Sequence, residues 1–172
     1  MSVKNVLDTF GKRVIQQSKS NLTKLDKKDS SKLYNSLRFE VSEHKKSFSL
    51  SIQMEDYGQF VDKGVRGKKS SKKAPRSPFK FGSGTGKRGG LTSGIDSWVR
   101  RKRFQFKDKK TGKFLSYKST AFLITRSIYN TGLETTNFFT KPFENEFKKL
   151  PNEVIKAYGL EVNQLMKLAF KK

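Results

Sequence analysis

The sequence contains no cysteine and only one histidine, His44. Without cysteine the chain has no disulfide framework, no catalytic thiol and no cysteine-based zinc site. We interpret His44 as a solvated turn residue, because no second histidine or cysteine exists to complete a zinc site or a nucleophilic triad. No run approaches the roughly 18 apolar residues that cross a bilayer, and the first residues carry no apolar signal segment. We therefore expect a soluble protein with no membrane partner.

Acidic residues are scarce relative to basic ones. The chain of 172 residues has 15 Asp and Glu against 38 Lys and Arg, which gives a net charge of +23. Self-repulsion of this size has to be offset by a polyanion or by an acidic partner surface, so we expect the physiological state to be a complex. Only 33% of the residues are hydrophobic, yet 15 phenylalanines are too many for a disordered chain. The length predicts a single domain, residues 1–172, with a basic excursion from its core.

The few acids do not converge on a catalytic site. Nuclease chemistry would need several carboxylates around one metal ion. The candidates fall on different predicted elements: Asp56, Asp62, Asp96, Asp108 and Glu134. The glycine-rich segment 82–88 lacks the spacing and the preceding strand of a phosphate-binding P-loop, so we interpret it as a spacer. We predict that the protein is not an enzyme and has no catalytic residue, cofactor or metal.

Apolar periodicity predicts an α+β fold. A stripe at helical spacing predicts a helix over 3–24, and alternation over 37–41 and 48–54 predicts a β-hairpin connected by residues 43–46. Further helices are predicted at 95–102 with Ser93 as cap, at 119–131 ending at Gly132, from Thr140, and from Pro151. Residues 104–117 are a candidate second hairpin. We expect a small antiparallel sheet covered on one face by the N-terminal and C-terminal helices, with a core that includes Phe39, Leu50, Ile52 and Phe60.

Residues 63–90 are the strongest local feature. They hold ten Lys and Arg, seven Gly and two Pro, and no acid. This composition predicts a mobile loop that becomes ordered on a partner. Its candidate contact residues are Lys68, Lys69, Lys72, Lys73, Arg76, Lys80, Lys87 and Arg88, and a second basic cluster comprises Arg100, Arg101, Lys102 and Arg103. Nucleic acid and an acidic protein surface could each neutralise this positive charge equally well, so both remain candidate partners.

Several short motifs then occur in a recognisable order. They are Ser31-Lys32-Leu33-Tyr34-Asn35-Ser36-Leu37, the run from Asp56 to Gly67 that contains Tyr57-Gly58-Gln59-Phe60-Val61-Asp62-Lys63-Gly64, then Ile95 to Lys102, Ala121 to Ile128, Gly132 to Phe139, and Pro142-Phe143. Together they cover residues 29–147 and resemble the neck and tail-completion proteins of tailed bacteriophages, the head–tail joining family. Asp62 stands where that family more often has Glu, and the basic loop and the 104–117 insertion are longer than usual.

The resemblance implies a structural virion protein, made in the host cytoplasm and located in the phage neck. It implies a homo-oligomeric ring that joins the head connector or portal to the tail around the DNA channel, with contacts to neighbouring connector, portal or tail proteins. Such a ring could also contact the packaged DNA. We expect Tyr57, Phe60 and Val61 to anchor the hairpin to the core, and Gly64 and Gly67 to release the chain into the loop. The alternative is a non-specific nucleic-acid-binding protein in which the basic loop 63–90 and residues 100–113 bind phosphate directly.

Overall fold

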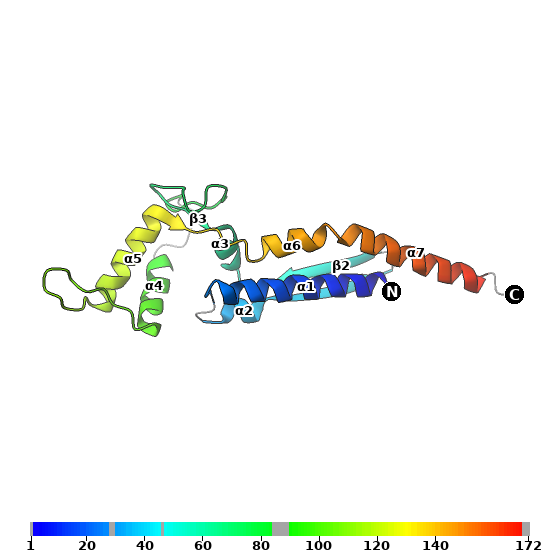
Figure 1. Cartoon of the computed structure of the whole chain (residues 1–172), viewed down its shortest axis with the longest axis horizontal. Coiled ribbons are helices and arrows are strands. Elements are labelled where there is room, and N and C mark those ends of the chain that lie inside the picture. Colours follow the sequence, from blue (N-terminus) through cyan, green and yellow to red (C-terminus); the bar gives the residue numbers. More distant parts are fainter. Residues whose placement is uncertain (1, 28–29, 46, 84–89, 170–172) are drawn as a thin grey trace. The chain divides into compact units, whose positions relative to one another are not determined.

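The computed structural model describes residues 2–27, 30–45, 47–83 and 90–169, with side chains as far as residue 159 (Figure 1). The chain divides into two compact units. Met1–Gly58 and Asn137–Lys172 form the first unit, which we call the hairpin unit. Gln59–Thr136 form the second, which we call the basic unit. The basic unit is thus an insertion into the sequence of the hairpin unit.

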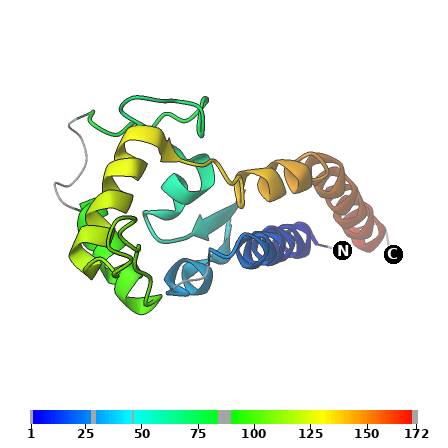
Figure 2. The same ribbon diagram turned by 60° about the vertical axis from the view of Figure 1, so that its left-hand side comes forward.

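The hairpin unit has the predicted mixture of helices and a small antiparallel sheet. It contains α1 (Val3–Lys24), α2 (Lys32–Ser36), β1 (Arg38–His44), β2 (Ser47–Gln53), α6 (Thr140–Phe147) and α7 (Leu150–Ala169). β1 and β2 pair so that Phe39 lies opposite Ile52 and Val41 opposite Leu50. α1 packs on both strands and also on α6 and α7 (Figures 1 and 2). The predicted α+β class, the 3–24 helix, the hairpin, and the helices from Thr140 and near Pro151 are confirmed.

The core of the hairpin unit follows the apolar stripe of α1. Val6 and Phe10 are 2% exposed, and Val14 and Leu22 are fully buried. The Phe10 ring meets the Phe143 ring of α6 edge to face, with centroids 5.6 Å apart. Ser2 is the N-cap of α1: its hydroxyl accepts a hydrogen bond from the Asn5 amide at 3.2 Å and so satisfies one of the free N–H groups of the first turn.

Two expectations about side chains around the hairpin are corrected. Phe60 is 38% exposed and lies in α3 (Gly58–Lys63), where its ring packs against Phe79 of the basic unit with centroids 4.6 Å apart. Tyr57 is 39% exposed, so neither aromatic anchors the hairpin. The close packing there involves Gly58, at which a Cβ atom would lie 2.7 Å from Sδ of Met54. His44 ends β1 instead of lying in the turn, and it is exposed as expected.

The basic unit is a helical pair closed by a short two-stranded ladder. It comprises most of α3, then β3 (Val65–Arg66), α4 (Gly90–Arg101), α5 (Tyr117–Thr131) and β4 (Gly132–Leu133). α4 packs on α5, and β3 pairs antiparallel with β4. Its buried positions include Val65, Ala74, Val99, Thr120 and Ala121. The hydroxyls of Thr136 and Thr135 donate to the carbonyls of Val61 and Lys63 at 2.7 and 2.9 Å, which ties the two ends of the unit together.

The predicted ends of the two long helices in this unit need adjustment. Ser93 lies inside α4 and does not cap it. α5 begins at Tyr117, because the Ser116 hydroxyl accepts from the Ser119 amide at 3.1 Å and acts as the N-cap. Gly132 follows the last residue of α5 as predicted and has a φ of 90°, a conformation that favours glycine.

Candidate binding surfaces of the basic unit

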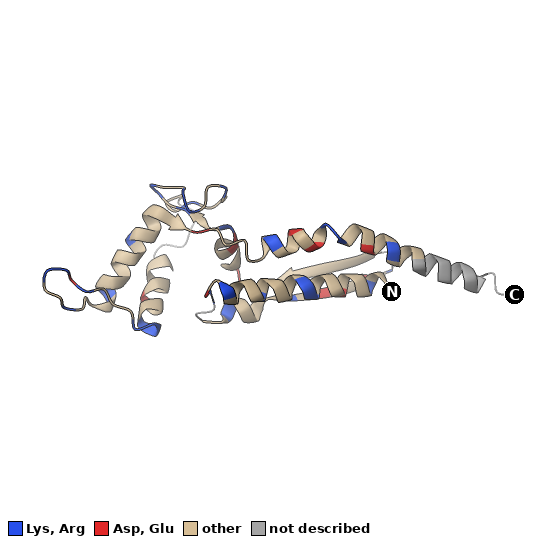
Figure 3. Cartoon of the chain, viewed as in Figure 1, with Lys and Arg blue, Asp and Glu red and all other residues tan. Residues whose placement is uncertain are grey.

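Positive charge is concentrated in the basic unit. Its 78 residues contain twenty Lys and Arg against four Asp and Glu, a net charge of +16, whereas the other 94 residues carry eighteen against eleven, or +7. Figure 3 shows lysines and arginines along the loop that follows β3 and along the loop between α4 and α5. Of the four acids, Asp62 is buried and Asp96 forms an ion pair with Arg100 at 2.9 Å. The excess charge therefore belongs to one part of the chain and is little offset there.

The first basic surface is the β3 loop, residues 67–83. Its backbone is bound to the end of α5: the amides of Lys68 and Lys69 donate to the carbonyls of Tyr129 and Asn130 at 2.9 and 3.1 Å. These are among the last carbonyls of the helix, which have no partner within the helix itself. The loop thus takes the place of water as a donor at the C-terminal end of α5.

The far side of the same loop is also fixed. Phe81 donates to the Arg66 carbonyl at 2.9 Å, and Arg66 donates to the Phe79 carbonyl at 2.8 Å. The Ser77 hydroxyl is buried and donates to the Gly64 carbonyl at 2.7 Å. The described part of the loop therefore has hydrogen-bond partners within its own chain, and its ordering by a partner stays a prediction. Residues 84–89, with Lys87 and Arg88, lie outside the described residues.

The two glycines that were expected to release the chain instead fix it. A Cβ atom on Gly67 would lie 2.5 Å from the Asn130 carbonyl carbon and 2.6 Å from the Gly132 amide nitrogen. Gly64 has a φ of 69°, in the left-handed region. Only glycine lets the backbone pass this close to the end of α5.

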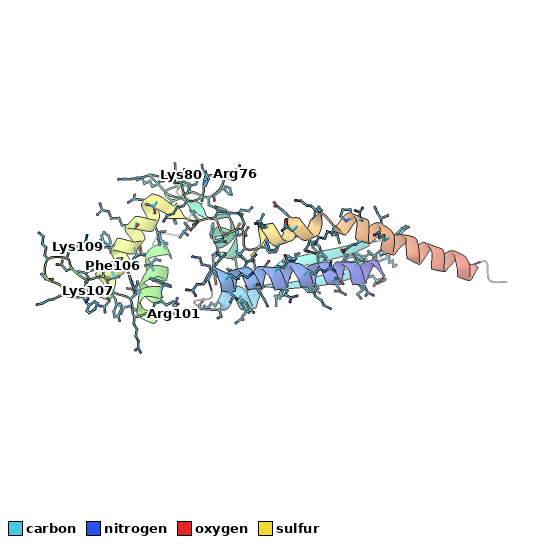
Figure 4. The ribbon with its side chains drawn as sticks, in the orientation of Figure 1. Arg76, Lys80, Arg101, Phe106, Lys107 and Lys109 are labelled. Carbon is cyan, nitrogen blue, oxygen red and sulfur yellow. The ribbon has the colours of Figure 1, made fainter. Side chains whose placement is uncertain are left out.

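The cationic side chains of the β3 loop all point outward. Lys68, Lys69, Lys72, Lys73, Arg76 and Lys80 are exposed. Figure 4 shows Arg76 and Lys80 on this loop near β3. The predicted contact residues in the described part of the loop therefore share one surface.

The second cluster lies at the other end of α5. Arg100 and Arg101 end α4, Lys102 and Arg103 follow, and all four are exposed. The Arg100 guanidinium lies 5.6 Å from the centre of the Tyr117 ring, at the start of α5. Its hydrogen bond and ion pair with Asp96 raise the pKa of Arg100 further above its ordinary value. Because α5 has 15 residues at about 1.5 Å each, about 22 Å of helix separates this cluster from the β3 loop.

The α4–α5 loop, residues 102–116, carries most of the stretch 100–113 that the nucleic-acid alternative predicts to bind phosphate. It contains one antiparallel bridge, Lys107 to Phe114, so the candidate second hairpin is reduced to a single bridged turn. Lys107, Lys109, Lys110 and Lys113 are exposed. Figure 4 shows Lys107 and Lys109 on this loop, together with Phe106. The sequence signal is that Phe104 and Phe106 precede these four lysines and Phe114 follows them within a short stretch.

Aromatic rings line the base of the α4–α5 loop and reach its surface. The Trp98 and Phe104 rings lie 6.0 Å apart, and Phe104 meets Phe106 edge to face at 5.2 Å. Phe114 is 64% exposed, with the Lys107 ammonium 5.0 Å from its ring centre. The loop thus presents cations and an aromatic face together.

The hairpin unit carries a different surface, which is apolar. An open groove of about 330 Å³ is lined by Leu50 and Ile52 of β2 and by Phe143 and Phe147 of α6. Phe147 is 51% exposed. On α7, Ile155 and Tyr158 are 69% and 64% exposed.

Within the described residues no group of three or more His, Asp or Glu side chains is placed to hold a metal ion. None of the described helices has the length and apolar character that crossing a membrane requires. Comparisons of the chain with protein-family models, with curated proteins and with solved structures gave no match.

Proposed function

We propose that the chain is a structural protein of a phage neck, which forms a ring between head and tail around the DNA channel. The observation that carries this proposal is the placement of charge: +16 of the +23 belongs to one compact unit. A subunit that has to face an acidic ring or a DNA channel needs its positive charge on one part of its surface. The order of the motifs between residues 29 and 147, with its resemblance to neck and tail-completion proteins, supports the same function.

The hairpin unit has features that suit contacts between copies. It carries both an open apolar groove, beside Phe147, and an exposed apolar pair on α7, Ile155 and Tyr158. When different patches of one chain bind each other head to tail, the contact is heterologous and closes into a ring if the rotation permits. In this proposal the hairpin unit holds the ring together, and the β3 loop contacts the adjoining neck component.

Two measurements test the proposal directly. Negative-stain images of concentrated protein are expected to show closed rings, and mass spectrometry of purified particles is expected to detect the chain. Only monomers at high concentration, together with absence from particles, would overturn the proposal.

A charge-reversal variant tests the role of the β3 loop. Replacing Lys68, Lys69, Lys72 and Lys73 with Glu takes the net charge from +23 to +15. Like charges that face each other across an interface cost several kcal/mol, so the variant is expected to leave separate heads and tails in a lysate. A matched control replaces Lys12, Lys24, Lys27 and Lys32, which are exposed in the hairpin unit, and also gives +15. Joined particles that contain the loop variant would refute the loop contact.

A non-specific nucleic-acid-binding protein is the second candidate, and the exposed lysines of both loops favour it. Such a protein holds DNA as a purified monomer with a steep dependence of log affinity on log salt. A neck subunit binds DNA weakly alone and partitions with particles. Filter binding against salt concentration, combined with the particle analysis, separates the two functions.

A further inference from the structure

The α4–α5 loop is held in a fixed shape by its only acid. Oδ1 of Asp108 accepts hydrogen bonds from the amides of Lys110 and Thr111 at 2.9 and 2.8 Å, and from the Thr111 hydroxyl at 3.1 Å. The Asp108 amide donates to the Lys113 carbonyl, and the Gly112 amide donates to the Asp108 carbonyl, both at 2.8 Å. The carboxylate is thus used to build the turn.

The base of the loop is fixed to α5 and to itself. The Phe106 amide donates to the Thr120 hydroxyl at 3.3 Å, and Leu115 donates to the Phe106 carbonyl at 2.8 Å. The Gln105 amide group donates to the Leu115 carbonyl at 2.7 Å. A loop built in this way holds its surface groups in place before any partner arrives, which lowers the entropy cost of binding.

The groups that it presents are lysines and an aromatic ring. Lys107, Lys109, Lys110 and Lys113 are exposed within seven consecutive residues, and Phe114 is 64% exposed beside them. The interior of a protein–protein interface is depleted in lysine, whereas lysine is a common donor to phosphate. Exposed aromatic side chains among basic ones are typical of surfaces on which nucleic-acid bases stack. Both features favour nucleic acid over an acidic protein.

We infer that the α4–α5 loop is a nucleic-acid contact in its own right, in which the four lysines bind backbone phosphates and Phe114 offers a face to an unpaired base. The site is distinct from the β3 loop, since the two lie at opposite ends of α5. It requires a nucleic acid but no ring, so it holds for a neck subunit that contacts DNA in its channel and equally for a free protein. Its failure would leave the neck proposal untouched.

The first test compares two variants of equal charge. Lys107, Lys109, Lys110 and Lys113 are replaced by Gln in one, and Lys12, Lys24, Lys27 and Lys32 in the other, so that both have a net charge of +19 instead of +23. Affinity for a fluorescent duplex and a single strand, each of about 30 nucleotides per strand, is measured by anisotropy from about 50 to 200 mM salt. The loop variant is expected to bind about tenfold or more weakly, and its salt slope to fall by up to about 3 to 4 units on the duplex. The control variant is expected to lose far less affinity for DNA.

A second pair of variants tests whether the fixed shape matters. Asp108→Asn removes the negative charge but keeps an Oδ1 acceptor for all three hydrogen bonds, whereas Asp108→Ala removes the charge and the acceptor. Both raise the net charge to +24. If charge alone decided binding, the two would bind alike. We expect Asp108→Ala to bind several-fold more weakly than Asp108→Asn.

Several outcomes of these experiments would contradict the proposed nucleic-acid contact. Equal losses in the two lysine variants, or wild-type protein that shows no DNA binding at about 50 mM salt, would refute the site. If the wild-type protein bound polyglutamate of matched charge as tightly as DNA, the partner of this loop would be an acidic protein and not nucleic acid. Phe114→Ala is expected to weaken binding to the single strand more than binding to the duplex. An equal loss of affinity for both would refute base stacking.

Discussion

The ring of Phe39 in β1 packs directly against the backbone of Gly11 in α1. A Cβ atom at position 11 would lie 2.7 Å from Cγ and 2.8 Å from Cε2 of Phe39. Glycine inside a helix is destabilising by roughly 0.5–1 kcal/mol relative to alanine, so this position carries a penalty in the helix. The absence of a side chain is what lets the hairpin approach α1 at this point.

Gly11→Ala is therefore expected to lower the free energy of unfolding. Overpacking against the ring costs typically about 1–3 kcal/mol, which exceeds the gain of about 1 kcal/mol in helix propensity. Gly159→Ala is the control, because this exposed glycine also lies inside a helix of the hairpin unit and has no atom within 4 Å of a Cβ position. That variant is expected to gain stability. Urea denaturation measures both, and equal changes would mean that the ring can move aside.

The same relationship shows what the sequence predicts and what it does not. Helix 3–24 and the hairpin were predictable because their periodicity lies within a few neighbouring residues. Gly11 weakens the helix prediction when the sequence is considered alone, since its partner Phe39 is 28 positions away. Phe60 shows the reverse error: its apolar character predicted burial, whereas the residue is 38% exposed and its ring packs against Phe79.

Phe138 is expected to be a major source of stability in the hairpin unit. It is fully buried, and its carbonyl accepts a hydrogen bond from the Asn21 amide group at 3.1 Å. Phe138→Ala is expected to cost about 3–5 kcal/mol in denaturant unfolding, because it leaves a cavity. Phe147→Ala is the comparison, since this ring is 51% exposed and stacks on Phe143 at 5.7 Å. The loss there is expected to be about 1 kcal/mol, the scale of one aromatic pair. Similar losses for both would contradict the assigned burial.

Glu146 is expected to make stability depend on pH. Its side chain is 6% exposed, and burial by itself would raise the pKa of the carboxyl. Hydrogen bonds from Lys149 at 3.0 Å and Gln17 at 3.2 Å, with the charges of Lys149 and Arg13, outweigh burial and lower that pKa. Because the pKa of Glu146 is lowered in the folded state, its contribution to stability is complete above the unfolded-state pKa of about 4.3. That contribution is lost as the pH falls through the folded-state pKa.

The measurement is the free energy of unfolding at several pH values below about 5. Wild-type stability is expected to decline there, and Glu146→Gln is expected to flatten the decline while lowering stability near neutral pH. Glu144→Gln, an exposed carboxyl on the same helix, is expected to retain the wild-type slope. Identical slopes for Glu146→Gln and wild type would show that the Glu146 contacts contribute nothing to folding.

The sequence predicts where the basic residues of the candidate surfaces lie, but not the hydrogen bonds that shape the two loops. Composition located the excess of lysine and arginine in residues 63–90 and 100–103. It could not show that Lys68 would find its hydrogen-bond acceptor on Tyr129, because that partner is 61 positions further along the chain. The fixed shape of the α4–α5 loop was similarly hidden, since it depends on Asp108 using its carboxylate for backbone donors.

Gly67 is expected to control the order of the β3 loop. The atoms that a Cβ would meet, the Asn130 carbonyl carbon and the Gly132 amide nitrogen, belong to the backbone and cannot rotate away. Gly67→Ala is therefore expected to push the loop from α5 and break the hydrogen bonds of the Lys68 and Lys69 amides. Proteolysis requires local opening, so limited trypsin digestion is expected to cut after Lys68 and Lys69 much faster in this variant than in wild type. Gly94→Ala, with no atom within 4 Å of a Cβ position on α4, is expected to keep the wild-type cleavage rate. Fast cleavage after these lysines already in the wild type would show that the hydrogen bonds to Tyr129 and Asn130 do not hold the loop, and the β3 loop would then depend on its partner for order.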